Sequence, residues 1–251
     1  MSITPKAWLF TYYQHNDLQV ALQKIEPHDI IIAVDSGADL LLKYNIIPHH
    51  IIGDFDSIDN NILTKNNHNS TSHKEKLNYQ QILANTNIIE LDKNKNETDT
   101  EIAIDFCIKN GYKEIYLVNS MQNRLDHILG VISTIENSFD QGIQIRVITA
   151  WQEVFLAKKS QELRYLENTV FSLCPLSEVV SGINTHNCRY PLKHESLYRN
   201  KTRGISNVIN SNNAHITYNE GKLLVIVQTQ SKQSQIFQTA EFTEQFNAIK
   251  A

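Results

Sequence analysis

The chain has 251 residues, of which 41% are apolar, so it can bury a core without disulfides or a structural metal ion. Its 23 basic and 27 acidic residues give a formal net charge of −4, which leaves no electrostatic footprint for nucleic acid or anionic lipid. No apolar stretch approaches the ~18 residues of a membrane span, and the N-terminus lacks a signal-peptide pattern. We therefore expect a cytoplasmic protein that binds a small molecule or another protein, with no nucleic acid and no membrane as partner.

Short apolar runs and helix-like segments alternate in the first half of the chain. The runs are expected strands at residues 7–12, 30–34, 51–52, 88–91 and 115–118. Between them, apolar residues recur at intervals of three and four in segments 18–25, 38–44 and 98–109. This alternation predicts βαβ units and a mainly parallel sheet.

Two helices of this region have further signals. Thr98 is followed three residues later by Glu101, which is the spacing of a helix capping box. A later helix is expected from about Asp126 to Ile135, because its apolar residues form one face.

Strand-like segments dominate after about residue 137. They lie at residues 144–149, 154–156, 170–174, 215–218 and 223–227. Residues 219–222 between the last two contain Gly221, which favours a hairpin turn. We predict an α/β domain at residues 1–140 and an all-β domain at residues 141–251.

Acidic residues directly follow two of the expected strands. Asp35 follows the run 30–34, and Asp54 and Asp56 follow the run 51–52. Ligands of open α/β sheets bind outside the carboxyl ends of strands, so these carboxylates are expected to converge. A single Asp there fits a helix cap equally well. Asp54 and Asp56, however, point to the same side of an extended chain and repel unless a cation joins them, which favours a Mg²⁺ site.

Further charged residues stand at two helix starts. Asp99 lies in the first turn after Thr98, where a carboxylate also complements the helix dipole. Arg124 can hold phosphate oxygens, Asp126 can accept a hydroxyl proton or hold metal, and His127 can orient either. A local ion pair between Arg124 and Asp126 explains the same pattern equally well. The chain has neither a P-loop nor a GxGxxG motif, so magnesium and scattered polar groups would have to neutralise the phosphates of a nucleotide.

These motifs together resemble the thiamine pyrophosphokinase family. The matching stretches in the first half are VDSGAD at 34–39, IGDFDSI at 52–58, ETD at 97–99 and RLDH at 124–127. The second half continues the match at residues 171–176, 190–192, 204–207 and 221–225. All of them come in the order of the family.

The resemblance implies a fold, a reaction and an assembly. The fold would be an N-terminal Rossmann-like parallel-sheet domain followed by a C-terminal all-β sandwich. The reaction would be the transfer of diphosphate from ATP, as co-substrate, to the hydroxyl of thiamine, with Mg²⁺ as cofactor and AMP as second product. The assembly would be a homodimer whose active sites are shared between subunits.

The resemblance also implies the site residues. The catalytic residues would be Asp54, Asp56, Asp99, Arg124 and Asp126, of which the first three would bind the metal ion. The nucleotide and its metal ion would also contact Asp35, Ser57, Asn96 and His127. Thiamine would contact Ser206 and Asn207.

The chain departs from the family pattern at three places. The first strand ends in TYYQ at 11–14 where the family has a Gly-rich turn, and the polar segment 65–76 is longer than expected. Asn96 stands where the family usually has Asp, so an oxygen ligand remains but its charge is lost. Gln122 and Asn123 replace a usual glycine pair. Glycines let the backbone approach a ligand closely, so the replacement disfavours backbone contact with the nucleotide at this loop.

Two alternative functions follow from the same residues. A haloacid-dehalogenase-like phosphohydrolase would use Asp54 to Ser57 as its DxDx[T/V] loop, although that loop normally follows the first strand. A non-catalytic thiamine- or nucleotide-binding module is the other alternative, because of Asn96 and the missing glycines.

Overall fold

The computed structural model describes residues 5–54, 86–122 and 124–229. The chain divides into two compact units, and the division falls between Arg124 and Leu125. The division into compact units places residues 125–140 with the strands that follow them. The domain boundary expected near residue 140 stays a prediction. None of the helices in the described ranges has the length and apolar character needed to cross a bilayer.

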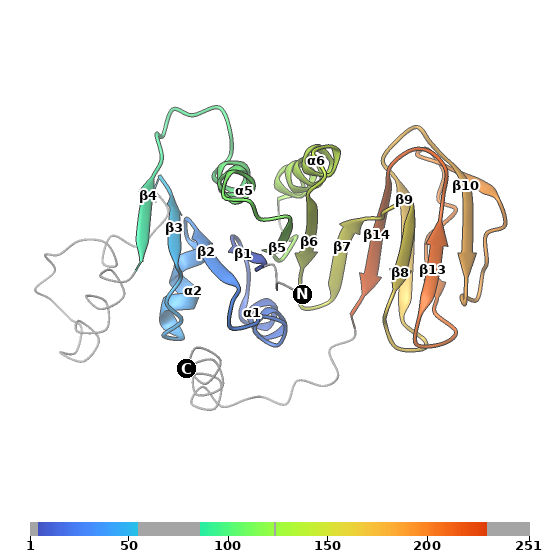
Figure 1. The fold of residues 1–251 in the computed structure, drawn as a ribbon, viewed down its shortest axis with the longest axis horizontal. Coiled ribbons are helices and arrows are strands. Elements are labelled where there is room, and N and C mark those ends of the chain that lie inside the picture. The colour runs from blue at the N-terminus through green and yellow to red at the C-terminus, as the bar shows by residue number, and fades with distance from the viewer. Residues whose placement is uncertain (1–4, 55–85, 123, 230–251) are drawn as a thin grey trace, which may run out of the picture. The chain divides into compact units, whose positions relative to one another are not determined.

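The first unit is built on five parallel strands in the order β5-β1-β2-β3-β4 (Figure 1). The strands are β1 (Ala7–Phe10), β2 (Ile30–Val34), β3 (His50–Gly53), β4 (Asn87–Glu90) and β5 (Glu114–Val118). The helices are α1 (His15–Leu22), α2 (Gly37–Lys43) and α5 (Asp99–Lys109). In Figure 1, α5 lies on one side of these strands, and α1 and α2 lie on the other. The mixed α/β architecture with a parallel sheet is therefore confirmed.

Burial explains why the strands β1 and β2 have continuous apolar runs. All four residues of β1 are fully buried, as are Ile32 and Ala33 of β2. Strands that are covered on both faces need apolar side chains at every position, not at alternate positions. The helix start at Thr98 is also confirmed, because the Thr98 hydroxyl accepts a hydrogen bond from the Glu101 amide at 3.2 Å.

The strand order places a topological switch in the first unit. From β1, the chain moves to β2, β3 and β4 on one side and returns to β5 on the other. At such a switch the connections leave the carboxyl ends of neighbouring strands in opposite directions, which opens a crevice there. The segments that follow β1, β2, β3 and β5 therefore belong to the edge of the sheet where a ligand is expected.

The second unit contains α6 (Leu125–Asp140) and two antiparallel groups of strands. The first group, in the order β12-β9-β14-β7-β6, consists of β6 (Gln144–Ile148), β7 (Gln152–Leu156), β9 (Val170–Pro175), β12 (Asn207–Val208) and β14 (Leu223–Gln228). The second group, in the order β11-β10-β13-β8, consists of β8 (Ser160–Leu163), β10 (Val179–His186), β11 (Glu195–Tyr198) and β13 (Ala214–Thr217). Helix α6 packs on β6 and β7.

One apolar cluster fills the space between these two groups of strands. Phe155, Phe171 and Val225 contribute from the first group, and Leu163 and Ile216 from the second. Two sheets that share one core in this way have the arrangement of a β-sandwich.

The prediction of a hairpin at residues 219–222 is wrong. Gly221 does have a positive φ of 90°, as the turn requires, but β13 and β14 do not pair with each other. The turn instead carries the chain from one sheet to the other. A Cβ on Gly221 would lie 2.6 Å from the carbonyl oxygen of Val179, so the crossing also needs close backbone approach.

Candidate active site

Asp35 is the first carboxylate at the carboxyl edge of the parallel strands. It follows β2 with a φ of 48°, in the left-handed region that Asp tolerates better than most residues. Its amide donates to the carbonyl oxygen of Ile52 at 3.0 Å, which ties this turn to the neighbouring strand β3. Its Oδ1 atom is buried and accepts no hydrogen bond from the described residues. A non-glycine residue held in this conformation, with an unsatisfied oxygen, is typical of a functional site.

Gly53 makes room for the Asp35 carboxylate. A Cβ placed on Gly53 would lie 1.9 Å from Oδ1 of Asp35, a distance that no side chain can occupy. The parallel register pairs Val34 with Ile52, so the next residues along the two chain segments, Asp35 and Gly53, are also neighbours. The glycine at the end of β3 therefore explains how Asp35 and Asp54 are accommodated at adjacent strand ends.

A lysine joins the next two carboxylates. The Nζ atom of Lys95 lies 2.9 Å from Oδ2 of Asp54 and 2.9 Å from Oδ1 of Asp99. Only 12% of the Lys95 and Asp54 side chains and 20% of the Asp99 side chain are exposed. Asp54 follows β3, whereas Asp99 opens α5, so the ammonium group connects the strand edge to the helix.

The charges of this group strongly affect one another. Burial, together with the carboxylates of Asp99 and Asp54, raises the pKa of Asp35 to about 7, although Lys95 opposes this shift. Burial alone would lower the pKa of Lys95, but hydrogen bonds to Asp99 and Asp54 outweigh it and raise that pKa. Nearby carboxylates raise both pKa values, in addition to the effect of burial on Asp35.

The donor set fits a divalent cation. Two carboxylates contact one ammonium group, and a third, that of Asp35, interacts with all of them electrostatically, which leaves two negative charges when all are ionised. The Lys95 ammonium group already lies where a cation satisfies two carboxylates at once. Hard oxygen ligands of this kind are those that Mg²⁺ prefers. Asp54 and Asp99 are therefore the described residues that best suit a metal ion, with Asp35 beside them.

The ends of β1 and β5 form the other part of this edge. The Asn119 side chain donates to the Thr11 hydroxyl at 2.9 Å, and its Oδ1 accepts from the amide of Met121 at 2.8 Å. The Ser120 hydroxyl donates to Oδ2 of Asp17, which also accepts from the amide of Gln14 at 2.8 Å. These bonds fix the two loops on either side of the topological switch without using Asp35 or Asp54.

Some predicted site residues lie outside this group. Asp56 and Ser57 lie outside the described residues, so their roles stay predictions. Asn96 is exposed in the loop before α5. Arg124 is exposed at the end of the first unit. Asp126 and His127 are exposed in the first turn of α6, in the second unit.

The predicted thiamine residues lie at β12 in the second unit. Ser206 is exposed with a φ of 60°, and its amide donates to the Ser172 hydroxyl at 3.0 Å. Asn207 is only 6% exposed, and its side chain is engaged inside the unit. Its Oδ1 accepts from the amides of Tyr190 and Val208 at 3.0 and 2.8 Å, and its Nδ2 donates to the Tyr190 carbonyl at 2.8 Å. Asn207 thus holds the Tyr190 loop, and a contact of Asn207 with thiamine stays a prediction.

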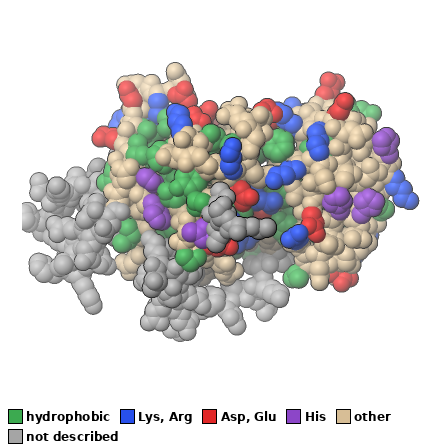
Figure 2. All heavy atoms as spheres, viewed as in Figure 1, with side chains coloured by type: hydrophobic (Ala, Val, Ile, Leu, Met, Phe, Trp, Pro, Cys, Tyr) green, Lys and Arg blue, Asp and Glu red, His purple; other side chains and the backbone are tan. Residues whose placement is uncertain are grey.

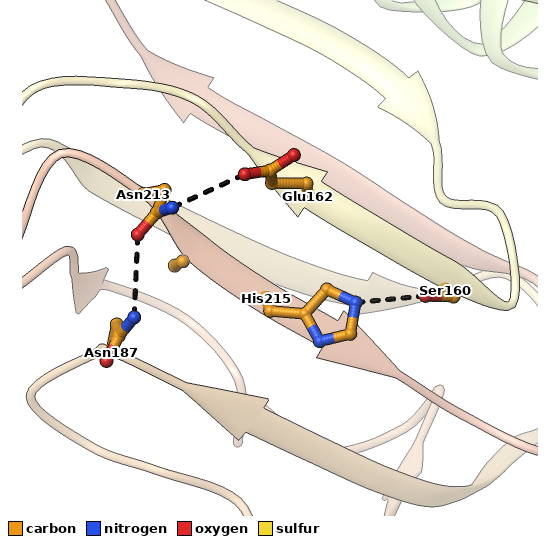
Figure 3. A pocket seen from close by; sticks show the side chains of 6 residues that line it. Ser160, Glu162, Asn187, Asn213 and His215 are labelled. Carbon is orange, nitrogen blue, oxygen red and sulfur yellow. Dashed lines mark hydrogen bonds between the residues drawn. The ribbon is translucent and has the colours of Figure 1, made fainter.

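A separate polar cavity of about 430 Å³ lies on the four-stranded sheet. In Figure 3, His215 points toward Ser160, and Asn213 lies between Glu162 and Asn187. His215 and Ser160 are hydrogen-bonded at 2.9 Å, and Glu162 accepts from Asn213 at 3.3 Å. Arg164 compensates the Glu162 charge at 2.8 Å. Because these polar groups satisfy one another, the cavity offers less to a phosphate or metal ion than the edge near Asp54.

A cluster of potential metal ligands elsewhere is also internally satisfied. Glu26, His28 and Asp29 lie close enough to share an ion. Asp29, however, accepts hydrogen bonds from the amide of Lys6 and from the indole of Trp8, at 3.0 and 2.9 Å. Lys6 also pairs with Glu26 at 3.2 Å. These contacts anchor the start of β1, which is a structural role.

Charges of both signs are mixed on the visible surface of the molecule. On the face drawn in Figure 2, Lys and Arg side chains (blue) are scattered among Asp and Glu side chains (red). Dispersed charges of both signs give no extended positive surface on that face of the kind that binds a nucleic-acid backbone.

Lys95 is the residue that sequence reasoning missed. The visible signal was its position in the loop just before α5, four residues from Asp99, although Lys95 itself lies outside the helix. The loop LDKNKNETD also contains Lys93, however, so the spacing alone does not identify the functional lysine. The contact with Asp54, 41 residues away, depends on the tertiary structure.

Two family models match most of the chain. One, described as thiamin pyrophosphokinase, catalytic domain, matches residues 21–147. The other, described as thiamin pyrophosphokinase, vitamin B1 binding domain, matches residues 157–223. The first therefore contains Asp35, Asp54, Lys95 and Asp99, and the second contains Asn207.

Individual proteins show the same similarity. A curated thiamine pyrophosphokinase of Bacillus subtilis (strain 168) is 24% identical over 211 residues, which cover 81% of this chain and 89% of that protein. A crystal structure of thiamine pyrophosphokinase from Bacillus subtilis matches with a TM-score of 0.74 at 22% identity, covering 90% of this chain and 99% of that one. The thiamin pyrophosphokinase structure from Candida albicans has a TM-score of 0.68 at 18% identity and covers 90% of each chain. These structures share the fold of this chain.

Proposed function

Because this chain belongs to the thiamin pyrophosphokinase family, we propose that it transfers the diphosphate group of ATP to the hydroxyl of thiamine, giving thiamine diphosphate and AMP. The observation that carries this proposal is the group of Asp35, Asp54 and Asp99 at the carboxyl edge of the parallel strands, inside the matched catalytic domain. Phosphoryl-type transfer requires mainly positioning and charge neutralisation, and a carboxylate group that attracts a divalent cation supplies the latter.

The first unit would serve as a Rossmann-like nucleotide domain. In this proposal Asp54 and Asp99 hold Mg²⁺ together with Asp56, which lies outside the described residues. When bound, the metal ion would neutralise the oxygens of the transferred diphosphate group. Asp35, whose raised pKa reflects the crowding of carboxylates, would contact the nucleotide and its metal ion from the end of β2. Ser57, Asn96 and His127 complete the proposed contacts on this side.

The exposed residues around the start of α6 would serve the reacting groups. Arg124 would hold phosphate oxygens, since a guanidinium group matches them with two parallel hydrogen bonds. Asp126 would accept the proton of the thiamine hydroxyl as the oxygen attacks the β-phosphorus of ATP, and AMP leaves with the electrons of the broken bond.

The second unit would bind thiamine near Ser206 and Asn207. Asn207 holds the main chain of Tyr190, whose side chain is 62% exposed beside this segment. We therefore propose that Asn207 contributes to the thiamine site by holding the main chain of Tyr190 in place. Its amide then acts on thiamine binding through Tyr190.

We further propose a cytoplasmic homodimer whose active sites combine the first unit of one subunit with the second unit of the other. Exposed apolar side chains in the second unit, among them Leu125, Leu129 and Ile205, are consistent with an interface. Mixing the inactive variant Asp56→Asn with the weakened variant Asn207→Ala should then restore activity, because one site of each heterodimer carries neither change. If subunit exchange is verified and activity stays at the Asn207→Ala background, each site is built within one chain.

The two alternative functions receive no support from these comparisons. Both matched models belong to thiamin pyrophosphokinase, and Asp54 follows β3, whereas the haloacid dehalogenase loop follows the first strand. The binding-module alternative predicts ligand binding without turnover.

One experiment tests the reaction. Purified protein is incubated with thiamine, ATP and MgCl₂, and the products are separated by chromatography. Equal amounts of AMP and thiamine diphosphate are expected. ADP with thiamine monophosphate, or free phosphate released from ATP alone, would contradict the proposal.

A further inference from the structure

Lys95 already occupies the position of a counterion between two proposed metal ligands. Its ammonium nitrogen is 2.9 Å from a carboxylate oxygen of Asp54 and 2.9 Å from one of Asp99. The lysine side chain is largely shielded from solvent, with 12% of its surface exposed. A surface lysine gains little from one carboxylate, but a shielded lysine held by two is a defined part of the site.

A magnesium ion and this ammonium group cannot use the same oxygens at once. Magnesium binds oxygen ligands at about 2.0–2.1 Å and requires near-octahedral geometry. The Lys95 ammonium group lies 2.9 Å from both carboxylates and so fills the space between them, and it donates a hydrogen bond to Oδ2 of Asp54. Metal binding to Asp54 and Asp99 therefore has to move Lys95 away.

We propose that Lys95 is a resident counterion that is exchanged for Mg²⁺, and that its released ammonium group then pairs with a phosphate of the bound nucleotide. This inference rests on the proposed function for the identity of the metal ion and the nucleotide. Before the metal ion arrives, Lys95 keeps the carboxylates of Asp54 and Asp99 together. Afterwards its charge is available to the phosphates, which lack a P-loop to neutralise them.

The side chain of lysine suits such an exchange. Its ammonium group is a compact charge on a flexible four-carbon stem, so it can change partners while its backbone stays in place. The backbone of Lys95 belongs to a turn, in which its amide donates to the carbonyl of Asp92 at 3.4 Å, and the cap at Thr98 follows three residues later. The exchange thus requires rotation of one side chain only.

A consequence is coupling between metal and nucleotide. Magnesium alone must displace Lys95 without giving it a new partner, so its affinity is low. Magnesium with nucleotide supplies a phosphate for the displaced ammonium group, so each ligand strengthens the binding of the other.

The test uses the full-length protein and the variant Lys95→Met, which keeps a long side chain but removes the charge. Lys93→Met is the matched control, because it changes the same charge at an exposed position two residues upstream. Calorimetric titration with MgCl₂ alone should show at least about fivefold tighter binding to Lys95→Met than to wild type, since a unit charge a few ångströms away is removed. Lys93→Met should differ from wild type by less than about twofold.

The second titration uses magnesium with α,β-methylene-ATP. The increase in metal affinity caused by the nucleotide analogue should be at least about fivefold smaller in Lys95→Met than in wild type. Magnesium binding to Lys95→Met that is no tighter than to wild type, including no binding to either, would overturn the proposal.

A measurement on the wild-type protein keeps the proposal testable if Lys95→Met does not fold. Amine-directed labelling followed by mass spectrometry should modify Lys95 at least about threefold faster with MgCl₂ than with EDTA, whereas Lys93 should be unchanged. Equal labelling of Lys95 in both conditions would contradict the exchange. These readouts measure binding, so a failure of the thiamine reaction itself would be recognised separately, by absent product in the wild type.

Discussion

Replacing Asp54 by Asn removes one of the two carboxylates that Lys95 joins while keeping the size and one oxygen of the side chain. In the proposed reaction this takes a charged ligand from the metal ion that neutralises the transferred group. Electrostatic contributions of this kind are typically worth about 3–4 kcal/mol, which corresponds to a loss of roughly 10²- to 10³-fold in kcat. The fold should remain intact.

The expected effect of Asp54→Asn on stability is small because two opposing terms change together. At an effective dielectric constant of about 20, a pair at 2.9 Å attracts by about 6 kcal/mol, so the variant loses that attraction to Lys95. It also loses the repulsion from Asp99, whose oxygen contacts the same ammonium group and is at most about 5.8 Å away, worth about 3 kcal/mol or more. The variant also loses the repulsion from Asp35 and the cost of burying the Asp54 charge. These two gains offset much of the remaining loss of attraction to Lys95. The free energy of unfolding without metal should therefore change by less than about 2 kcal/mol.

The measurements are steady-state kinetics at saturating thiamine and urea unfolding in EDTA. Asp105→Asn is the matched control, because it makes the same change at an exposed position of α5 and should keep wild-type values in both assays. Near-normal magnesium-dependent turnover of Asp54→Asn would refute the metal assignment. A loss of stability far above about 2 kcal/mol would show instead that Asp54 acts mainly through its ion pair.

Three other changes test further parts of the proposed site, two in the first unit and one in the second. Gly53→Ala should lower turnover at least about tenfold, because its Cβ would lie 1.9 Å from Oδ1 of Asp35. In Gly130→Ala, a control in α6, the new Cβ meets nothing within 4 Å, so urea unfolding should show a protein more stable by about 0.4–1 kcal/mol. Asn207→Ala should cost about 1–3 kcal/mol in unfolding free energy, since it leaves the main chain of Tyr190 without partners, and it should raise the KM for thiamine more than that for ATP. An unchanged melting temperature would contradict the structural part of that role. Asp35 binds its proton more tightly when folded, with a pKa of about 7 against 3.8, so this contribution to metal-free stability is present below pH 4 and is lost as pH rises to about 7. After allowance for solvent screening we expect about 2 kcal/mol, and urea unfolding of Asp35→Asn should lack that slope.

Several features of the fold could be predicted from the sequence because their causes are local. The apolar runs at β1, β2 and β5 are continuous, since both faces of these strands are buried, and the runs identify them directly. The cap at Thr98 depends on residues three apart and was equally visible. The strands β8, β10, β11 and β12 were missed. Short segments such as ESLY and NV contain too few apolar residues to show a period, and β10 (VVSGINTH) is interrupted by a glycine and polar residues.

The failed hairpin shows the limit of local reasoning. The positive φ of Gly221 was predictable from the residue type, but the partners of β13 and β14 were not. Turn chemistry fixes how the chain bends at residues 219–222. Which strands then pair is decided by the core that the two sheets share, and that core includes residues far apart in the sequence.

The candidate site divides in the same way between sequence and structure. The sequence by itself placed Asp35 and Asp54 at strand ends and Asp99 at a helix start, because strands and caps are local patterns, and the ordered motifs indicated the family. Only the tertiary structure showed that the parallel register sets Asp35 beside Gly53. It alone also brought Lys95 between Asp54 and Asp99, because a contact across 41 residues depends on how β3 and α5 pack and not on any spacing in the chain.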